Sequence, residues 1–297
     1  MRTNRTLIVP HPLLTWCPHS CRPMENAMFE LYLHRWDLVP DGEPIVTPTA
    51  QLLPVLRQET PAMLKLSSQP DQQRGAALME WWAGGGAAEV FARDNNAVLI
   101  ERATGTRSLA DMARVGEDDS ACRILCATAD RLHRQRPGKL PDLVPLHLWF
   151  HDLEIAAAKH GGILAQSLQA AQTLLANPRE QTVLHGDLHH DNVLDFLERG
   201  WRAIDPHGLI GERGFDFANI FTNPDLSDPD RPVATQPGRF HRRLSVVTEA
   251  AGLERHRLLQ WILAWTGLSA AWFLEDGDPL AEVDLVIAAI AASELAR

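Results

Sequence analysis

The hydrophobic pattern changes near residue 105, and this change limits the chain to a fold with two unlike halves. From Trp36 onward, short apolar runs such as WDLVPDGEPIV, LLPVLR and PAMLKLS are separated by turn residues, which predicts an antiparallel meander of strands. Beyond residue 105, apolar residues recur at helical spacing over longer segments. With 297 residues the chain has room for two lobes, each with its own core.

We therefore predict an α+β fold with a β-rich N-lobe over residues 28–104 and a helical C-lobe over residues 105–297. Residues 1–27 are interpreted either as a poorly ordered N-terminal extension or as the product of an upstream start codon. The periodicity predicts six main helices: Asp71–Ala83, Asp119–Arg136, Pro145–His160, Ile163–Ala176, Glu254–Leu274 and Pro279–Leu295. Trp261, Trp265 and Trp272 form a helical stripe, which we interpret as core rather than as a ligand platform.

Two short motifs in the N-lobe have different interpretations. In AMLKLS the alternation places Ala62, Leu64 and Leu66 on one face of a strand and Lys65 on the other, so the lysine is aimed at a fixed side. The triple glycine of residues 84–86 predicts the end of a helix and a turn. It does not form a phosphate loop, because no Lys-Ser or Lys-Thr pair follows it.

The composition restricts the partners of the chain. The formal charge is −10 and no dense basic cluster is present, which argues against nucleic acid and favours a small cationic molecule. The four cysteines fall in two sets with a spacing of four residues, Cys17 with Cys21 and Cys122 with Cys126. On a helix this spacing puts both cysteines on one face and does not suggest a disulfide, so we expect a reducing cytoplasm. A zinc site at Cys17 and Cys21 with nearby histidines is the less favoured interpretation. We interpret the uncharged segment 258–274 as a buried helix and not as a membrane span.

The polar stretch HGDLHHDN, residues 185–192, carries the chemistry of the chain. It precedes a predicted β-hairpin that turns near Gly200, with Leu197 paired to Trp201 and Val193 opposite Asp205. This fold-back brings Asn192 close to Asp205, and an amide beside a carboxylate suits Mg²⁺. With Asp187 to accept a hydroxyl proton and Lys65 as a cation for phosphates, the set of residues is that of phosphoryl transfer.

HGDLHHDN followed by AIDPHGLIGERGFDFAN resembles the aminoglycoside phosphotransferase family, in particular its streptomycin 6-kinases and hydroxyurea phosphotransferases. The resemblance continues from AMLKLS through LIERATG to the closing helices. It implies a protein-kinase-like fold that binds ATP between the lobes, at a hinge over residues 101–105. The activity it implies is ATP-dependent phosphorylation of a hydroxyl of a cationic aminocyclitol, with streptomycin first, or of hydroxyurea.

The resemblance also implies roles for individual residues. Asp187 is the catalytic aspartate, and His185 supports its loop. Asn192 and Asp205 are the magnesium ligands, whereas Lys65 contacts the phosphates of ATP. Backbone groups from Glu101 to Ala103 hold the adenine, and Thr47 and Thr49, with backbone amides of the segment VTPTAQ, cover the phosphates.

The sequence departs from the family pattern at three places. The helix acid that pairs with the strand lysine is not evident in PDQQRG, which leaves Asp71, Gln72 or the more distant Glu80. The segment over the phosphates lacks Gly-x-Gly, and residue 207 is His where relatives often have Lys. If the missing acid matters, a nucleotide-binding relative with weak activity is an alternative.

Two further alternatives concern acidic and histidine clusters. His185, Asp187, His189, His190 and Asp191 have the spacing of a binuclear metal hydrolase, which is the less favoured interpretation because it gives no function to Lys65 or the hairpin. The carboxylates of NPDLSDPDRP line an acidic substrate pocket or, in the favoured interpretation, belong to a solvated loop: Asp225, Asp228 and Asp230.

Overall fold

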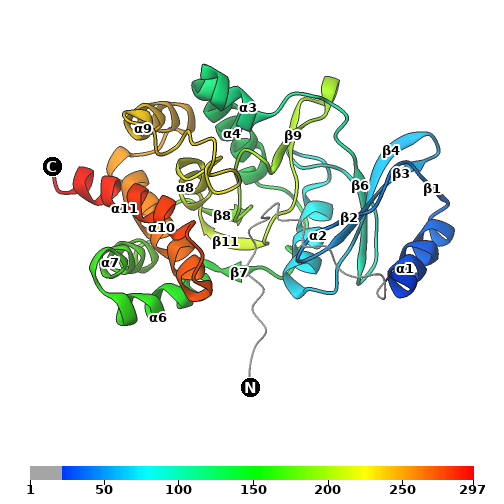
Figure 1. Ribbon diagram of the computed structural model, residues 1–297, viewed down its shortest axis with the longest axis horizontal. Helices are drawn as coiled ribbons and strands as arrows, with labels where there is room; N and C mark the ends of the chain where they lie inside the picture. Colours follow the sequence, from blue (N-terminus) through cyan, green and yellow to red (C-terminus); the bar gives the residue numbers. More distant parts are fainter. Residues whose placement is uncertain (1–21) are drawn as a thin grey trace.

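The computed structural model describes the backbone of residues 22–297 and the side chains of residues 28–297. A sheet forms one lobe and helices form most of the other (Figure 1). The sheet has the order β1-β3-β4-β6-β5, with β2 paired to β3, and all its pairings are antiparallel. Its elements are α1 (Arg22–Arg35), β1 (Leu38–Pro40), β2 (Ile45–Val46), β3 (Gln51–Arg57), β4 (Thr60–Leu66), α2 (Pro70–Trp82), β5 (Val90–Arg93) and β6 (Ala97–Glu101).

The two faces of this sheet pack into different cores. Ala62, Leu64 and Leu66 of β4 are buried in a small core with α1, which confirms the predicted alternation. Residues of the opposite face of β6 and of α2 belong instead to the large core shared with the helical lobe. The N-lobe is therefore held to the rest of the molecule through one face of its sheet, the face toward which Lys65 points.

The second lobe is helical around two small sheets. Its helices are α3 (Leu109–Met112), α4 (Asp118–His133), α5 (Leu146–Trp149), α6 (His151–His160), α7 (Gly162–Ala176), α8 (Phe215–Ala218), α9 (Arg239–Ala251), α10 (Arg255–Asp276) and α11 (Ala281–Leu295). Its strands are β7 (Val144–Pro145), β8 (Gln181–Leu184), β9 (Val193–Asp195), β10 (Trp201–Ala203) and β11 (Leu209–Glu212), where β11 lies between β7 and β8 and β10 pairs with β9. Helices α6, α7, α10 and α11 lie at the end of the molecule farthest from α1 (Figure 1).

Most predicted helices are confirmed, but the one from Pro145 to His160 is wrong. Val144 and Pro145 form β7, which pairs in parallel with β11, and the helix is divided into α5 and α6 at Phe150. Phe150 is 2% exposed and its ring packs against Phe215 and Trp261. Trp261 and Trp265 are buried and Trp272 packs against the same core, which confirms the interpretation of the tryptophan stripe.

The hairpin forms, but its predicted register is wrong by two residues. Trp201 pairs with Asp195 and Ala203 with Val193. The turn is longer than predicted because Leu197–Arg199 forms a 3₁₀ turn, and its first amide donates to the Asp195 carboxylate at 3.0 Å. Asn192 nevertheless lies beside the end of β10, because its carbonyl accepts from the Ile204 amide at 2.9 Å.

Helix α1 begins at Arg22, so residues 22–27, which were assigned to the extension, belong to this helix. The zinc interpretation of Cys17 and Cys21 lies outside the described residues. Cys122 and Cys126 are free and buried on α4. In the described part of the chain, every helix is too short or too polar to cross a membrane.

Candidate active site

The loop between β8 and β9 is anchored by the buried carboxylate of Asp216. The amides of His185 and Gly186 donate to its two oxygens at 2.9 and 2.8 Å. Burial alone would raise the pKa of Asp216, but its hydrogen bond with His133 and these amides hold the pKa below its ordinary value. Gly186 has φ +89°, and a Cβ there would lie 2.9 Å from the side chain of Leu209. Glycine is thus required at this turn.

His185 joins the loop to the end of β10. Its ring is fully buried, Nε2 lies 2.9 Å from the Ile204 carbonyl, and Nδ1 accepts from the Asp187 amide at 3.2 Å. These partners assign the Nε2–H tautomer, since Nδ1 is an acceptor. Burial lowers the pKa of His185, which keeps the ring neutral. The ring fixes the loop and is not free to exchange protons with a substrate.

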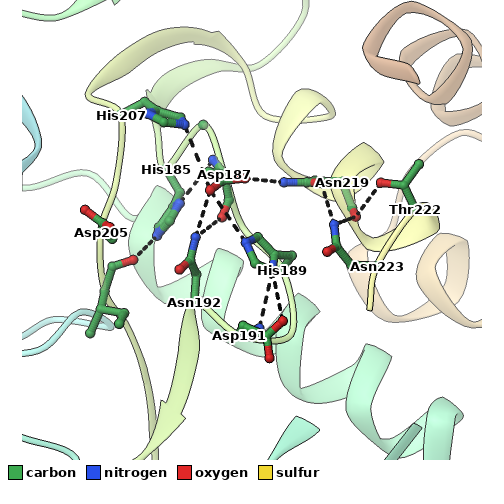
Figure 2. A network of polar contacts seen from close by, with 12 residues as sticks. His185, Asp187, His189, Asp191, Asn192, Asp205, His207, Asn219, Thr222 and Asn223 are labelled. Atoms are coloured by element: carbon green, nitrogen blue, oxygen red, sulfur yellow. Dashed lines mark hydrogen bonds and ion pairs between the residues drawn. The ribbon is translucent and has the colours of Figure 1, made fainter. Parts of the chain in front are cut away.

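Asp187 is held by amide donors on both carboxylate oxygens (Figure 2). Oδ1 accepts from the Asn219 amide at 2.6 Å, and Oδ2 accepts from the Asn192 amide at 2.9 Å. The Nε2 atoms of His189 and His207 lie 3.5 and 3.9 Å from Oδ2. Burial alone would raise the pKa of Asp187, but the charge and hydrogen bond of His189 hold the pKa below its ordinary value. Asp187 is therefore ionised and fixed in direction.

The partner Asn219 continues into a buried polar network that sequence reasoning missed. The Asn223 amide donates to Asn219 Oδ1 at 2.9 Å, and the Asn223 carbonyl accepts from Arg243 at 2.6 Å. Arg243 forms a fully buried ion pair with Asp118, with Nη2 and Oδ1 2.7 Å apart. These residues come from α4, α9 and the segment after α8. Of these residues, only Asn219 lies in a motif that the sequence made recognisable, the segment GFDFAN.

Asn192 and Asp205 lie on either side of the hairpin end, as predicted. The Asn192 amide nitrogen is committed to the Asp187 carbonyl and carboxylate, both at 2.9 Å, which leaves its side-chain oxygen available. Asp205 has φ +59° and a side chain that is 38% exposed. Its Oδ1 lies 2.5 Å from the Lys65 ammonium. An available amide oxygen and a carboxylate that already holds a cation fit a magnesium site.

The ion pair with Asp205 is the only one that Lys65 makes within the described residues. The three candidate partners on α2 do not pair with it: Glu80 binds Arg93, and the Asp71 carboxylate accepts from Gln72 at 3.4 Å. Gln72 and Lys65 line the same small pocket, and the buried Gln72 Oε1 has no hydrogen-bond partner among residues 28–297. The lysine is thus held by a group of the C-lobe and not by an acid of α2.

The other predicted nucleotide contacts lie at two loops. Thr47 forms a tight turn in which its hydroxyl donates to the Ala50 carbonyl at 2.9 Å, and Thr49 accepts from Ser67 at 2.6 Å through its carbonyl. Glu101 ends β6, and its carboxylate pairs with Arg199 at 2.9 Å, whereas Ala103 lies in the connection between the lobes. The hydroxyl of Thr47 is therefore already engaged in the turn.

The histidine cluster does not form the alternative hydrolase site. Within residues 28–297, no group of three histidine, cysteine or acidic side chains is arranged to hold a metal. His185 uses both ring nitrogens on the backbone, and His189 Nδ1 accepts from the Asp191 amide at 3.3 Å. His190 is buried, and burial together with the charge of Arg243 lowers its pKa well below the ordinary value.

Asp225 of the acidic loop fits neither interpretation, because it neither lines a substrate pocket nor faces solvent. This carboxylate is 1% exposed and accepts from the amides of Val233, Ala234 and Thr235 at 2.7, 2.8 and 3.0 Å. Because these amides occupy both oxygens, Asp225 fixes the following turn and does not face a ligand. Asp228 pairs with Arg114 and Arg231, so the loop carries little free negative charge.

Comparison with known proteins gives one family and several relatives. The family model of aminoglycoside/hydroxyurea antibiotic resistance kinases matches residues 35–277. The chain is 56% identical to a streptomycin 3''-kinase of Klebsiella pneumoniae, over 87% of this chain and 98% of that protein. It is 32% identical to a streptomycin 6-kinase of Streptomyces griseus, over 91% and 87% of the two chains.

Solved structures share the fold at low sequence identity. The aminoglycoside phosphotransferase APH(4)-Ia, solved as a ternary complex with AMP-PNP and hygromycin B, matches with a TM-score of 0.65 and 15% identity, over 89% of this chain and 98% of that chain. An ethanolamine kinase of Plasmodium vivax matches with a TM-score of 0.60 and 13% identity, over 91% and 89%. These matches confirm the predicted bilobal, protein-kinase-like fold.

Proposed function

The chain belongs to the aminoglycoside/hydroxyurea antibiotic resistance kinases, and from this premise we propose that it uses ATP to phosphorylate a hydroxyl group of streptomycin. The observation that carries the proposal is that Asn192 binds the Asp187 carboxylate and also accepts from the amide next to Asp205, the residue that Lys65 contacts from the other lobe. The hydrolase alternative has no matching arrangement. The weak-relative alternative is disfavoured because Asp187, Asn192 and Asp205 are all present.

The chemical step requires little from the protein beyond positioning and charge. The acceptor oxygen forms a bond with the γ-phosphorus of ATP, the bond to the β,γ-bridging oxygen breaks, and ADP leaves. Asp187 orients the acceptor hydroxyl and takes its proton. Its two amide donors fix the direction of the carboxylate.

The nucleotide end of the site would be held by three groups. The amide oxygen of Asn192 and the carboxylate of Asp205 would bind Mg²⁺, which neutralises charge on the phosphates when bound. Lys65 would move from Asp205 to a phosphate oxygen. Its flexible side chain could reach either of these two anionic partners. Backbone groups of residues 101–103 would hold the adenine, with Thr49 and nearby amides over the phosphates.

The substrate class follows from charge and from the relatives. A chain of charge −10 attracts a polycationic sugar, and relatives at 56% and 32% identity are named for streptomycin. Their names place the phosphate on two different hydroxyls, 3'' and 6. Hydroxyurea is the second candidate, supported by the family description and by a hydroxyurea phosphotransferase of Kitasatospora aureofaciens at 28% identity.

The test is incubation of the purified protein with ATP, Mg²⁺ and either streptomycin or hydroxyurea. We expect mass spectrometry to detect one added phosphate on streptomycin and equal amounts of ADP, and NMR coupling to phosphorus to locate the hydroxyl. Phosphorylation of hydroxyurea alone would replace the proposed substrate. ADP formation without a phosphorylated product from either compound would reject the proposed function.

A further inference from the structure

The triple glycine after α2 lines an open pocket of about 190 Å³. The remaining lining side chains are all arginines, contributed by α4, the segment after it, and β10: Arg131, Arg134, Arg136 and Arg202. The pocket therefore lies where the end of α2 meets the C-lobe. In this region the amide of Ala203 donates to the Gly86 carbonyl at 2.9 Å, and the amide of Ala88 donates to the Ala203 carbonyl at 2.9 Å.

Three of these guanidinium groups have no carboxylate partner among the described residues, although the chain has ten more acidic than basic residues. Arg131 donates to the Trp201 carbonyl at 2.5 Å, and Arg136 donates to the carbonyls of Arg131 and Gly85. Arg202 donates to the Gly84 carbonyl. Only Arg134, which is exposed, forms an ion pair, with Asp130 at 2.9 Å. Backbone carbonyls orient these groups without neutralising them.

Two of the three glycines make room for the arginines. A Cβ at position 85 would lie 2.7 Å from Arg136 Nη2, and one at position 86 would lie 3.0 Å from Arg131 Cβ. At position 84 the nearest atom would be Nη2 of Arg199, at 3.4 Å, and this arginine is already paired with Glu89 and Glu101. The motif predicted only as a helix end therefore also makes room for a cluster of positive charge.

The charge in this cluster is compensated only in part, by Asp130 near Arg131 and by Glu89 and Glu101 near Arg202. Burial lowers the pKa of Arg131, Arg136 and Arg202, and neighbouring arginines lower each of them further. The planar guanidinium fork matches the oxygens of phosphate, with which it forms bidentate contacts. An anion placed here would relieve the repulsion and would contact α4 and β10 at once.

We propose that this pocket binds a small phosphate anion, of the class of inorganic phosphate and pyrophosphate. The site is separate from the proposed nucleotide site and does not depend on the proposed function. Gln72, which shares a pocket with Lys65, lies ten residues before the end of α2 at Trp82, about 15 Å along the helix axis, and the glycines follow that end. Because Arg202 precedes Asp205 by three residues, the bound anion also stabilises the strand that leads to the proposed metal ligand.

The test is calorimetric titration with pyrophosphate at constant ionic strength, in buffer with EDTA so that no metal brings phosphate to Asp205. We compare the wild type with Arg131→Gln/Arg202→Gln, which keeps amide donors for the backbone carbonyls, and with Lys65→Ala. The matched control is Arg123→Gln, an exposed arginine of α4 paired with Glu249. Thermal unfolding with and without pyrophosphate provides a second measurement.

We expect one pyrophosphate per chain in the wild type, the control and Lys65→Ala, with a higher melting temperature. We expect at least tenfold weaker affinity in the double variant. If that variant does not fold, Arg131→Lys, which keeps the charge without the planar fork, should weaken binding at least threefold. Absence of binding in the wild type, loss of binding in Lys65→Ala, or unchanged affinity in the arginine variants would overturn the proposal.

Discussion

The two ends of the proposed active site are held in different ways. Asp187 has an amide donor on each carboxylate oxygen, and one of them, Asn219, is fixed by a chain of contacts that reaches the buried Arg243–Asp118 pair. Lys65 has one partner, Asp205, which is itself a proposed ligand of Mg²⁺. The base is positioned by the C-lobe alone, whereas the lysine bridges the lobes.

This difference indicates that the acceptor end of the site is ready before any ligand binds and that the nucleotide end is completed by the nucleotide. A side chain fixed by several hydrogen bonds loses no further entropy when the substrate arrives. In the proposed mechanism Lys65 exchanges an anionic partner for a phosphate, and no acid of α2 pairs with it. Variants at the two ends should therefore affect different kinetic constants.

The largest effect is expected from Asp187→Ala. Removal of the general base should lower kcat about 10²- to 10⁴-fold. The affinity for ATP should change less than about threefold, because the proposed partner of Asp187 is the acceptor hydroxyl and not the nucleotide. Steady-state kinetics and calorimetric ATP titration check the two halves of this prediction, and wild-type turnover would remove the assignment of the base.

Lys65→Met should act on the nucleotide instead. Loss of a charge-assisted contact worth about 1.5–3 kcal/mol lowers kcat/KM for ATP about 10- to 100-fold. Lys159→Met, an exposed lysine of α6, is the matched control. An ATP dependence equal to that of the control would show that Lys65 does not contact the phosphates.

Asn219→Ala tests whether the network behind Asp187 matters. Loss of a hydrogen bond of about 1–2 kcal/mol to the carboxylate should lower kcat about tenfold, with KM for ATP unchanged. Asn177→Ala, at an exposed position after α7, should have no effect on kcat. If KM for ATP rose while kcat stayed constant, the two ends of the site would not be separately held.

A buried aspartate without such partners provides the contrasting case. Asp284 of α11 is fully buried, and burial raises its pKa well above the ordinary value, opposed only by the nearby Ser269. A carboxyl group whose folded pKa is raised stabilises the fold below its unfolded pKa. That contribution is lost as pH rises toward the folded pKa, by up to about 1.4 kcal/mol per pH unit.

Asp284→Asn stays neutral, so its stability advantage over the wild type should grow between pH 5 and pH 8. Urea unfolding at several pH values measures this difference. Glu282→Gln, at an exposed acid two residues earlier in α11, is the control and should show no such trend. A constant difference across this pH range would contradict the raised pKa.

Local patterns in the sequence were sufficient for much of the site. Alternation on one strand placed Lys65, and the loop and hairpin brought Asn192 close to Asp205. The hairpin register was wrong because the side chain of Asp195 stabilises a longer turn that apolar pairing does not reveal.

The remaining contacts depend on packing between segments far apart in the chain. Asp118 and Arg243 are 125 residues apart, and the arginines beside the triple glycine come from α4, the segment after it, and β10. No spacing rule links such positions. The break at Phe150 has the same origin, because only the packed core shows that its ring must turn inward.

The most direct measurement is a crystal structure with a non-hydrolysable ATP analogue, Mg²⁺ and streptomycin. The account predicts a metal bound to the Asn192 amide oxygen and the Asp205 carboxylate, and Lys65 moved from Asp205 to a phosphate. Asp187 should keep its two amide donors and face a streptomycin hydroxyl. A metal bound among residues 185–191, or an Asp187 carboxylate that points away from the bound sugar, would contradict it.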